Sequence, residues 1–203
     1  MKPPNALSDG ELRSYAEEHL RYEMDMLIWS AGILVTLATI KEKGQLPWAL
    51  NNSVLESFSI HARNLIDFLY SGSRNKDRAT DIVVEDYVDQ GALSAHLPPI
   101  TRLLEESITK ANKQVAHLTK ERIDYEKAGK AWSVTQVAQQ TVAAFNAIAP
   151  HFPSSRVSDK LRHQISQASL RIPSVRSVVV ANDQGRSVGV ELTLVLLNER
   201  EEA

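Results

Sequence analysis

A long apolar segment near the N-terminus constrains the fold more than any other feature of this chain. Residues 26–40 contain no charged side chain and lie between Asp25 and Lys41. As a helix, these 15 residues would span only about 22 Å, short of the roughly 30 Å hydrocarbon core of a bilayer. We therefore expect a helix buried in a protein core, packed between several neighbouring helices or between two subunits, and no membrane span.

The helix that contains this segment should begin well upstream of it. Ser8 and Glu11 have the Ser-x-x-Glu spacing of a capping box, which would satisfy two backbone donors at a helix start. Lys41 and Lys43 suit the negative end of the helix dipole, and Gly44 can adopt the left-handed stop. The sequence thus predicts one helix from about residue 9 to residue 43.

Apolar residues at three- and four-residue steps predict four further helices. They extend over about residues 47–70, 99–126, 134–149 and 158–170. Residues 81–88 are expected to add one or two helical turns, and Ser133 should cap the helix that follows it. The helix of residues 99–126 is predicted to be the central one of the bundle.

After Pro173, the spacing of apolar residues changes from the helical pattern to one typical of β-strands. Apolar residues dominate segments 177–181 and 187–197, and these flank the turn sequence Asn182-Asp183-Gln184-Gly185. The predicted class is an all-α bundle of four or five helices, with a helical domain at residues 1–172 and a C-terminal β-hairpin at 173–203. A lone hairpin is marginally stable. It needs the bundle surface, a second subunit's hairpin or another protein's edge strand as partner.

Composition excludes several classes of function. The formal net charge of −2 argues against a dedicated nucleic-acid coat but leaves room for a local basic face. The absence of cysteine excludes disulfides, thiolate metal sites and a cysteine nucleophile. No apolar segment follows Met1-Lys2-Pro3-Pro4-Asn5, so a secretory signal is not expected, and the cytoplasm is the predicted location.

One side of the predicted central helix carries the residues of most chemical interest. At 3.6 residues per turn, one helix face contains Glu106, Lys110, Lys113, His117 and Glu121. A helix face with charges of both signs is commonly an exposed surface with no role in binding or catalysis. The alternative depends on His117, which can exchange a proton near neutral pH. Two lysines nearby would favour the neutral form of His117, which can act as a general base. Such a face suits RNA cleavage in which a 2′-hydroxyl of the RNA attacks the neighbouring phosphate of the same strand.

The segment Asn112-Lys113-x-x-Ala116-His117 resembles the signature of the HEPN superfamily (higher eukaryotes and prokaryotes nucleotide-binding). That signature is an arginine, usually followed by asparagine, with a histidine four to six residues after the arginine. The resemblance implies a helical bundle that dimerises with its motif helices facing each other, and in many members a metal-independent ribonuclease. His117 matches the catalytic histidine and Asn112 the polar residue. Ala111 stands at the arginine position, where Lys110 is the possible substitute.

A second segment, residues 61–68, resembles a recurring stretch of uncharacterised bacterial helical proteins. This resemblance does not indicate a function. Arg63 and Asp67 lie four residues apart and are expected to form an ion pair. Arg63 also joins Lys110 and Lys113 as a candidate nucleic-acid contact. His61 lies at the flank of the apolar stripe and is interpreted as a hydrogen-bonded boundary histidine.

Three functions follow from these observations. The first is a HEPN-like interaction or nucleic-acid-binding module, catalytically weak or inactive, of a bacterial defence or toxin–antitoxin type. The second is an active metal-independent endoribonuclease that uses His117, and the third is a purely structural homodimer. A metal site of scattered residues, for example His61, His117 and Glu121, is a further alternative, although the sequence contains no His-Glu-x-x-His or Glu-x-x-His motif. We expect no metal or other cofactor, a homodimer, and RNA or another protein as partner.

Overall fold

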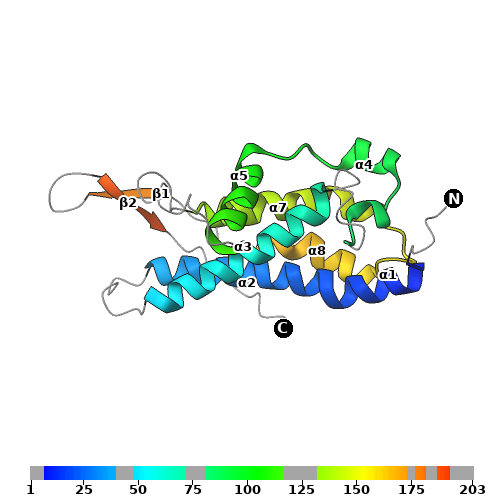
Figure 1. Ribbon diagram of the computed structural model, residues 1–203, viewed down its shortest axis with the longest axis horizontal. Helices are drawn as coiled ribbons and strands as arrows, with labels where there is room; N and C mark the ends of the chain where they lie inside the picture. Colours follow the sequence, from blue (N-terminus) through cyan, green and yellow to red (C-terminus); the bar gives the residue numbers. More distant parts are fainter. Residues whose placement is uncertain are drawn as a thin grey trace, which may run out of the picture.

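The computed structural model describes residues 7–39, 48–71, 81–116, 132–172, 177–181 and 187–192. Helices make up most of these residues, which confirms the predicted helical class (Figure 1). Within the described ranges, no helix has the length and hydrophobicity needed to cross a bilayer.

The N-terminal helix is continuous but changes its winding. It comprises α1 (Asp9–Tyr15), the π-helix η1 (Ala16–Leu20) and α2 (Arg21–Thr39). The capping box is confirmed: the Glu11 backbone N–H donates to Ser8 Oγ at 3.3 Å, and the Ser8 backbone N–H donates to Glu11 Oε2 at 2.7 Å. The π-helical turn was not predicted, because apolar spacing does not distinguish it from an α-helix.

The remaining helices follow the predicted order, with one addition. They are α3 (Trp48–Tyr70), η4 (Val84–Asp86), α4 (Gln90–His96), α5 (Arg102–Lys110), the π-helix η5 (Ala111–Ala116), α7 (Val134–Ile148), η6 (Ala149–His151) and α8 (Asp159–Arg171). Helix α4 was missed, although Asp89 caps it by accepting the Ala92 N–H at 2.8 Å. Ser133 precedes α7 as predicted, but its side chain makes no cap hydrogen bond.

Among the described residues, the helix with the most helical neighbours is α7, and not the described part of the helix predicted over residues 99–126, of which residues 117–126 lie outside the described residues. Helix α7 packs against α2, α3, α4, α5 and α8, whereas α5 packs mainly against α3 and α7. Residues 134–148 contain no charged side chain, so this helix can be surrounded without burying charge. Its fully buried residues are Val137, Ala138, Thr141, Val142, Ala144, Phe145 and Ile148.

An aromatic cluster ties the short element η4 to this core. The buried Tyr87 hydroxyl donates to the Leu12 carbonyl at 2.9 Å, and its ring contacts Phe68 and Phe152. Phe68 in turn stacks on Phe145, with ring centroids 5.7 Å apart. Burial raises the pKa of Tyr87, so the hydroxyl stays protonated as the donor of this hydrogen bond.

The apolar half of α2 is buried on one side only. Leu27 and Ala31 are fully covered, whereas Trp29 is 64% exposed and Ile33 is 39% exposed. Helix α2 packs against α3, α7 and α8, which confirms the prediction of several neighbouring helices, and Trp29 and Ile33 lie on the side that these helices do not cover. The other sequence-based option, a contact between two subunits, stays a prediction.

Two strands follow the helices. Strand β1 (Ser177–Ala181) pairs antiparallel with β2 (Ser187–Leu192), with Val179 opposite Val190 and an irregularity between Val179 and Ala181 (Figure 1). Residues 193–197, which the sequence assigned to the second strand, lie outside the described residues. The partner expected for this hairpin stays a prediction.

Candidate functional site

Residues 112–116 of the segment that resembles the HEPN motif lie in a π-helix. Helix α5 ends at Lys110, and η5 begins at Ala111 and ends at Ala116. A π-helical stretch is rare and is often found at functional positions, because it shifts side chains relative to the surrounding α-helix. His117 and Glu121 lie outside the described residues, so the roles assigned to them stay predictions.

Ala111 does not face solvent. It is 3% exposed and follows Leu104 and Ser107 along the buried side of α5. An arginine at this position would place a guanidinium in the protein core, which is unfavourable without a partner. The burial of Ala111 is therefore unfavourable for the arginine that the resemblance would place at this position.

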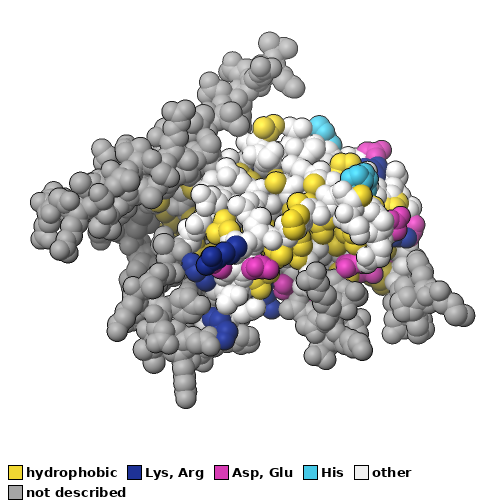
Figure 2. Space-filling model, turned by 90° about the horizontal axis from the view of Figure 1, so that it is seen from above, with side chains coloured by type: hydrophobic (Ala, Val, Ile, Leu, Met, Phe, Trp, Pro, Cys, Tyr) yellow, Lys and Arg dark blue, Asp and Glu magenta, His cyan; other side chains and the backbone are white. Residues whose placement is uncertain are grey.

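Lys110 and Lys113 are half-buried on the other sides of the helix. The Lys110 ammonium lies 5.9 Å from the centroid of the half-buried Trp132 ring, which is a cation–π distance. Earlier on α5, Arg102 Nε bonds Glu106 Oε1 at 2.7 Å. Figure 2, which views the molecule from above Figure 1, shows basic side chains on this face next to acidic ones and not in one continuous basic patch.

Arg63 lies elsewhere. The predicted ion pair with Asp67 is confirmed, with Arg63 Nε 3.5 Å from Asp67 Oδ2, but both residues line a cavity to which α5 and η5 contribute no described residue. The structure thus places Asn112, Lys110 and Lys113 on one helical segment and Arg63 in a separate site. A carboxylate already occupies the neighbourhood of Arg63, which makes the predicted phosphate contact there less favourable.

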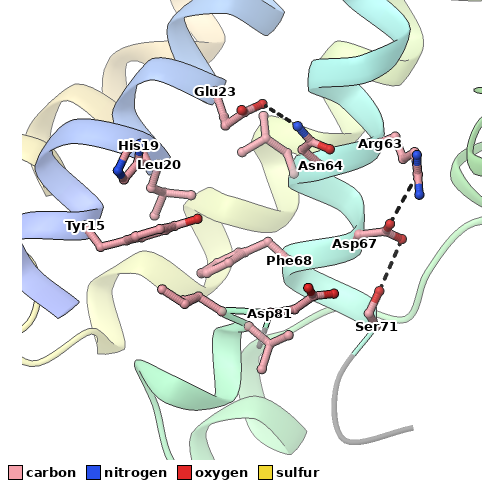
Figure 3. A pocket seen from close by; sticks show the side chains of 13 residues that line it. Tyr15, His19, Leu20, Glu23, Arg63, Asn64, Asp67, Phe68, Ser71 and Asp81 are labelled. Carbon is pink, nitrogen blue, oxygen red and sulfur yellow. Dashed lines mark hydrogen bonds and ion pairs between the residues drawn. The ribbon is translucent and has the colours of Figure 1, made fainter. Parts of the chain in front are cut away.

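This second site, which we call the polar cavity, is a hollow lined by charged, polar and apolar side chains (Figure 3). Its volume is about 540 Å³. Its walls come from the end of α1, η1, α2, α3 and the segment before η4. The lining residues are Tyr15, His19, Leu20, Glu23, Arg63, Asn64, Leu65, Asp67, Phe68, Ser71, Asp81, Ile82 and Val83.

Glu23 is held firmly at the edge of the polar cavity. Its Oε2 lies 2.8 Å from His61 Nδ1 and accepts a hydrogen bond from Asn64 Nδ2 at 3.2 Å. The His61 ring also meets Tyr22 edge to face. The prediction of a hydrogen-bonded boundary histidine is confirmed, because His61 is buried and paired with this carboxylate.

The sequence did not identify most residues of the polar cavity. His19, Glu23 and Asp81 come from separate segments, and nothing in their local spacing joins them. The π-helix η1 lies in the wall, and the Tyr15 and His19 rings are 4.7 Å apart across it. The one usable signal was the polar group His61, Arg63, Asn64 and Asp67 on α3.

The carboxylates of Glu23 and Asp81 affect the pKa of Tyr15. Burial raises the pKa of Tyr15, and the negative charges of Glu23 and Asp81 raise it further. Replacing Glu23→Gln removes one of these charges, so we expect the Tyr15 pKa to fall. The measurement is an ultraviolet titration of parent and variant, with Tyr15→Phe in both backgrounds to assign the transition. An unchanged or higher Tyr15 pKa in Glu23→Gln would contradict the geometry.

Among the described residues, no group of three or more histidine or carboxylate side chains is arranged to hold a metal ion. Comparison with family models, curated proteins and solved structures gave no match for this chain. What the two sites do must therefore be inferred from their own residues.

Proposed function

We propose that this protein is a HEPN-like helical module that binds single-stranded RNA through the polar sides of α5 and η5. The observation that carries the proposal is the π-helix at Ala111–Ala116, the segment in which the HEPN-like residues occur. The cellular setting that belongs to the proposal is a bacterial defence or toxin–antitoxin system.

The residues of this segment suit an RNA ligand. Lys110 and Lys113 supply two positive charges for phosphates, and Asn112 supplies an amide that can donate and accept. Trp132 adds an aromatic ring beside Lys110. Sites that bind single strands combine cationic and aromatic side chains in this way, since every base can stack on a ring. The chain's small net charge is compatible with one local basic site.

We propose that RNA cleavage is weak or absent. Stabilising the extra charge on a phosphate calls for a fixed cation beside the reacting group. Ala111 carries no charge at the arginine position, and the Lys110 ammonium cannot bind a phosphate in the bidentate geometry of an arginine guanidinium. His117 stays in the proposal as a polar RNA contact. The active ribonuclease with His117 as base is the alternative that experiment must exclude.

A homodimer completes the proposal, because the HEPN resemblance implies facing motif helices from two subunits. Trp29 and Ile33 leave apolar surface on α2 that a second chain can cover. Light scattering across micromolar concentrations should give twice the monomer mass. A monomer mass throughout this range would rule out an RNA site formed by residues of both subunits.

The test of function separates binding from cleavage. Fluorescently labelled single-stranded RNA is titrated with the parent protein at low salt and with a metal chelator, and the RNA is then checked for cuts. We expect binding with intact RNA. Cleavage that His117→Ala abolishes, in a folded variant, would establish the ribonuclease alternative. Absence of both binding and cleavage at low salt would overturn the proposal.

A further inference from the structure

A groove with apolar walls, which we call the apolar groove, lies between α3, η4, α4 and α5 and shares no lining residue with the polar cavity. We propose that it binds a small amphipathic amine, a protonated ammonium group carried on an apolar chain or ring. The proposal goes beyond the proposed function and does not depend on it, because Lys110, Asn112 and Lys113 do not line the groove.

The walls of the apolar groove can cover the apolar part of such a ligand. Its volume of about 690 Å³ falls in the usual range of small-molecule sites, roughly 300–1,000 Å³. Figure 2, which views the side of the molecule that carries α4 and α5, shows hydrophobic side chains gathered on this face. Apolar side chains of the lining include Leu69, Val84, Leu93, Leu97, Ile100 and Ile108. Contact with them would remove an apolar chain from water, which favours binding.

The charge of the lining favours a cation. The charged side chains that line the groove are Glu85 of η4 and Glu105 of α5, and no described lysine, arginine or histidine joins them. Within the described parts of the chain, neither carboxylate has a hydrogen-bond or ion-pair partner. A concave site lined by one sign of charge attracts ligands of the opposite sign, so a carboxylate or phosphate ligand would be repelled.

The cations on neighbouring elements are paired with other groups. Arg102, on the same helix as Glu105, bonds Glu106 with its Nε at 2.7 Å. Beside η4, Arg156 donates to the Asp86 carbonyl at 2.8 Å and pairs with Asp9 at 2.8 Å. Both guanidinium groups therefore leave the carboxylates of the groove uncompensated.

Glu85 gives the groove a specific reason to bind an ammonium group. Its Oε2 is buried and accepts no hydrogen bond from any described residue. A carboxylate oxygen that is removed from water without a partner costs free energy. An ammonium group in the groove beside Glu85 would offset part of this cost, and a charge-assisted hydrogen bond to the carboxylate is a strong one.

The apolar groove is formed before a ligand arrives. The Tyr70 hydroxyl of α3 donates to the Pro98 carbonyl at 3.1 Å, which ties the segment between α4 and α5 to the bundle. At the end of α4, the His96 ring stacks on the His151 ring of η6, with centroids 3.6 Å apart. Pro98 and Pro99 have restricted backbone angles. A site with fixed walls loses little conformational freedom when it binds.

The walls favour a small molecule over an extended peptide. Extended peptides are commonly held by backbone hydrogen bonds to the edge of a sheet. None of the described residues that line the groove belongs to a strand, and Pro98 and Pro99 have no backbone N–H to donate. The groove therefore supplies apolar contact and negative charge, but little hydrogen bonding for a peptide backbone.

Isothermal titration of the full chain at neutral pH tests the proposal with four probes. Octylamine carries an ammonium group on an apolar chain, and octanol has the same chain without the charge. Octanoate reverses the charge, and ethylamine keeps the charge without the long chain. We expect octylamine to bind at least about tenfold more tightly than octanol, and more tightly than octanoate and ethylamine. No binding of octylamine, or equal affinities for octylamine and octanol, would overturn the proposal.

Protein variants locate the binding. Glu85→Gln should weaken octylamine binding about tenfold, and Glu105→Gln about threefold, because Glu105 is exposed. Neither should change octanol binding, since only the charge is altered. Ser94→Trp places a large ring on the exposed side of α4 that lines the groove, and it should abolish binding of both probes. Glu18→Gln is the matched control, because Glu18 is exposed on η1 and does not line the groove.

Circular dichroism checks the fold of each variant, and Glu105→Gln decides if Glu85→Gln is unfolded. Octylamine binding that Ser94→Trp leaves unchanged, or that Glu18→Gln weakens as much as Glu85→Gln, would place the amine elsewhere and overturn the proposal. N-acetyl-lysine amide that binds as tightly as octylamine would assign the groove to a protein side chain and contradict a small-molecule ligand. Loss of RNA binding, in contrast, would overturn only the proposed function.

Discussion

Replacing Lys110 and Lys113 together by glutamate should weaken binding of single-stranded RNA about a hundredfold. Each substitution removes a contact with an RNA phosphate and adds a negative charge beside the RNA backbone. A tenfold loss of affinity for each substitution corresponds to about 1.4 kcal/mol of binding free energy. Both lysines lie on the helical segment α5–η5 and are only half-buried. The measurement is fluorescence anisotropy of labelled RNA at one fixed, low salt concentration.

A matched control separates a specific site from overall charge. Lys160→Glu makes the same charge change on the exposed side of α8, and it should alter affinity far less than Lys113→Glu alone. Equal losses for Lys160→Glu and Lys113→Glu would mean that RNA responds to the net charge of the protein. The proposed site on α5 and η5 would then be wrong.

Replacing Phe145 by alanine should lower the free energy of unfolding by about 3–5 kcal/mol, which is typical for deleting a buried aromatic ring. Phe145 is fully buried, and it lies on α7, which packs against five other helices. Its ring stacks on Phe68 at 5.7 Å, with the planes 9° apart. The substitution leaves a cavity at the meeting point of the bundle.

Urea unfolding measures this loss. Phe145→Leu should cost less, because leucine refills part of the space. Leu170→Ala serves as the exposed control, since Leu170 is 58% exposed on α8 and surface changes usually stay within about 0.5 kcal/mol. A loss below about 1 kcal/mol for Phe145→Ala would contradict the placement of α7 at the centre of the core.

Helix starts were the most predictable part of this fold, because a cap is a local event. Ser8 with Glu11, and Ser158, which accepts the Leu161 N–H, mark helix starts through residues only three positions apart. The central helix was harder to identify. Helix α5 is strongly amphipathic, which signals one buried side, whereas α7 has no charged residue and packs against five other helices.

The candidate sites were predictable only in part. The sequence placed Asn112, Lys110 and Lys113 on one helix, and the structure agrees with that placement. It misplaced Arg63, because a helix-by-helix interpretation cannot show that α3 faces η1 and the segment before η4. The π-helices were equally hidden, since one extra residue in a turn leaves the apolar pattern nearly unchanged.

Ala111 has two properties that the sequence predicts and only one of them concerns function. It stands at the arginine position of the HEPN-like signature, and by helical spacing it belongs to the apolar stripe opposite the polar face of the helix. The structure confirms the second property, because Ala111 is 3% exposed beside Leu104 and Ser107. Restoring arginine there is therefore expected to cost stability before it can restore any activity.

The salt dependence of RNA binding tests the central claim most directly. For a single strand, the logarithm of the binding constant falls with the logarithm of salt concentration by about 0.7 for each phosphate neutralised. The parent protein should therefore show a slope steeper by at least about 1.4 than Lys110→Glu/Lys113→Glu. Identical slopes for the two proteins would show that neither lysine contacts a phosphate, and the α5–η5 surface would not be an RNA site.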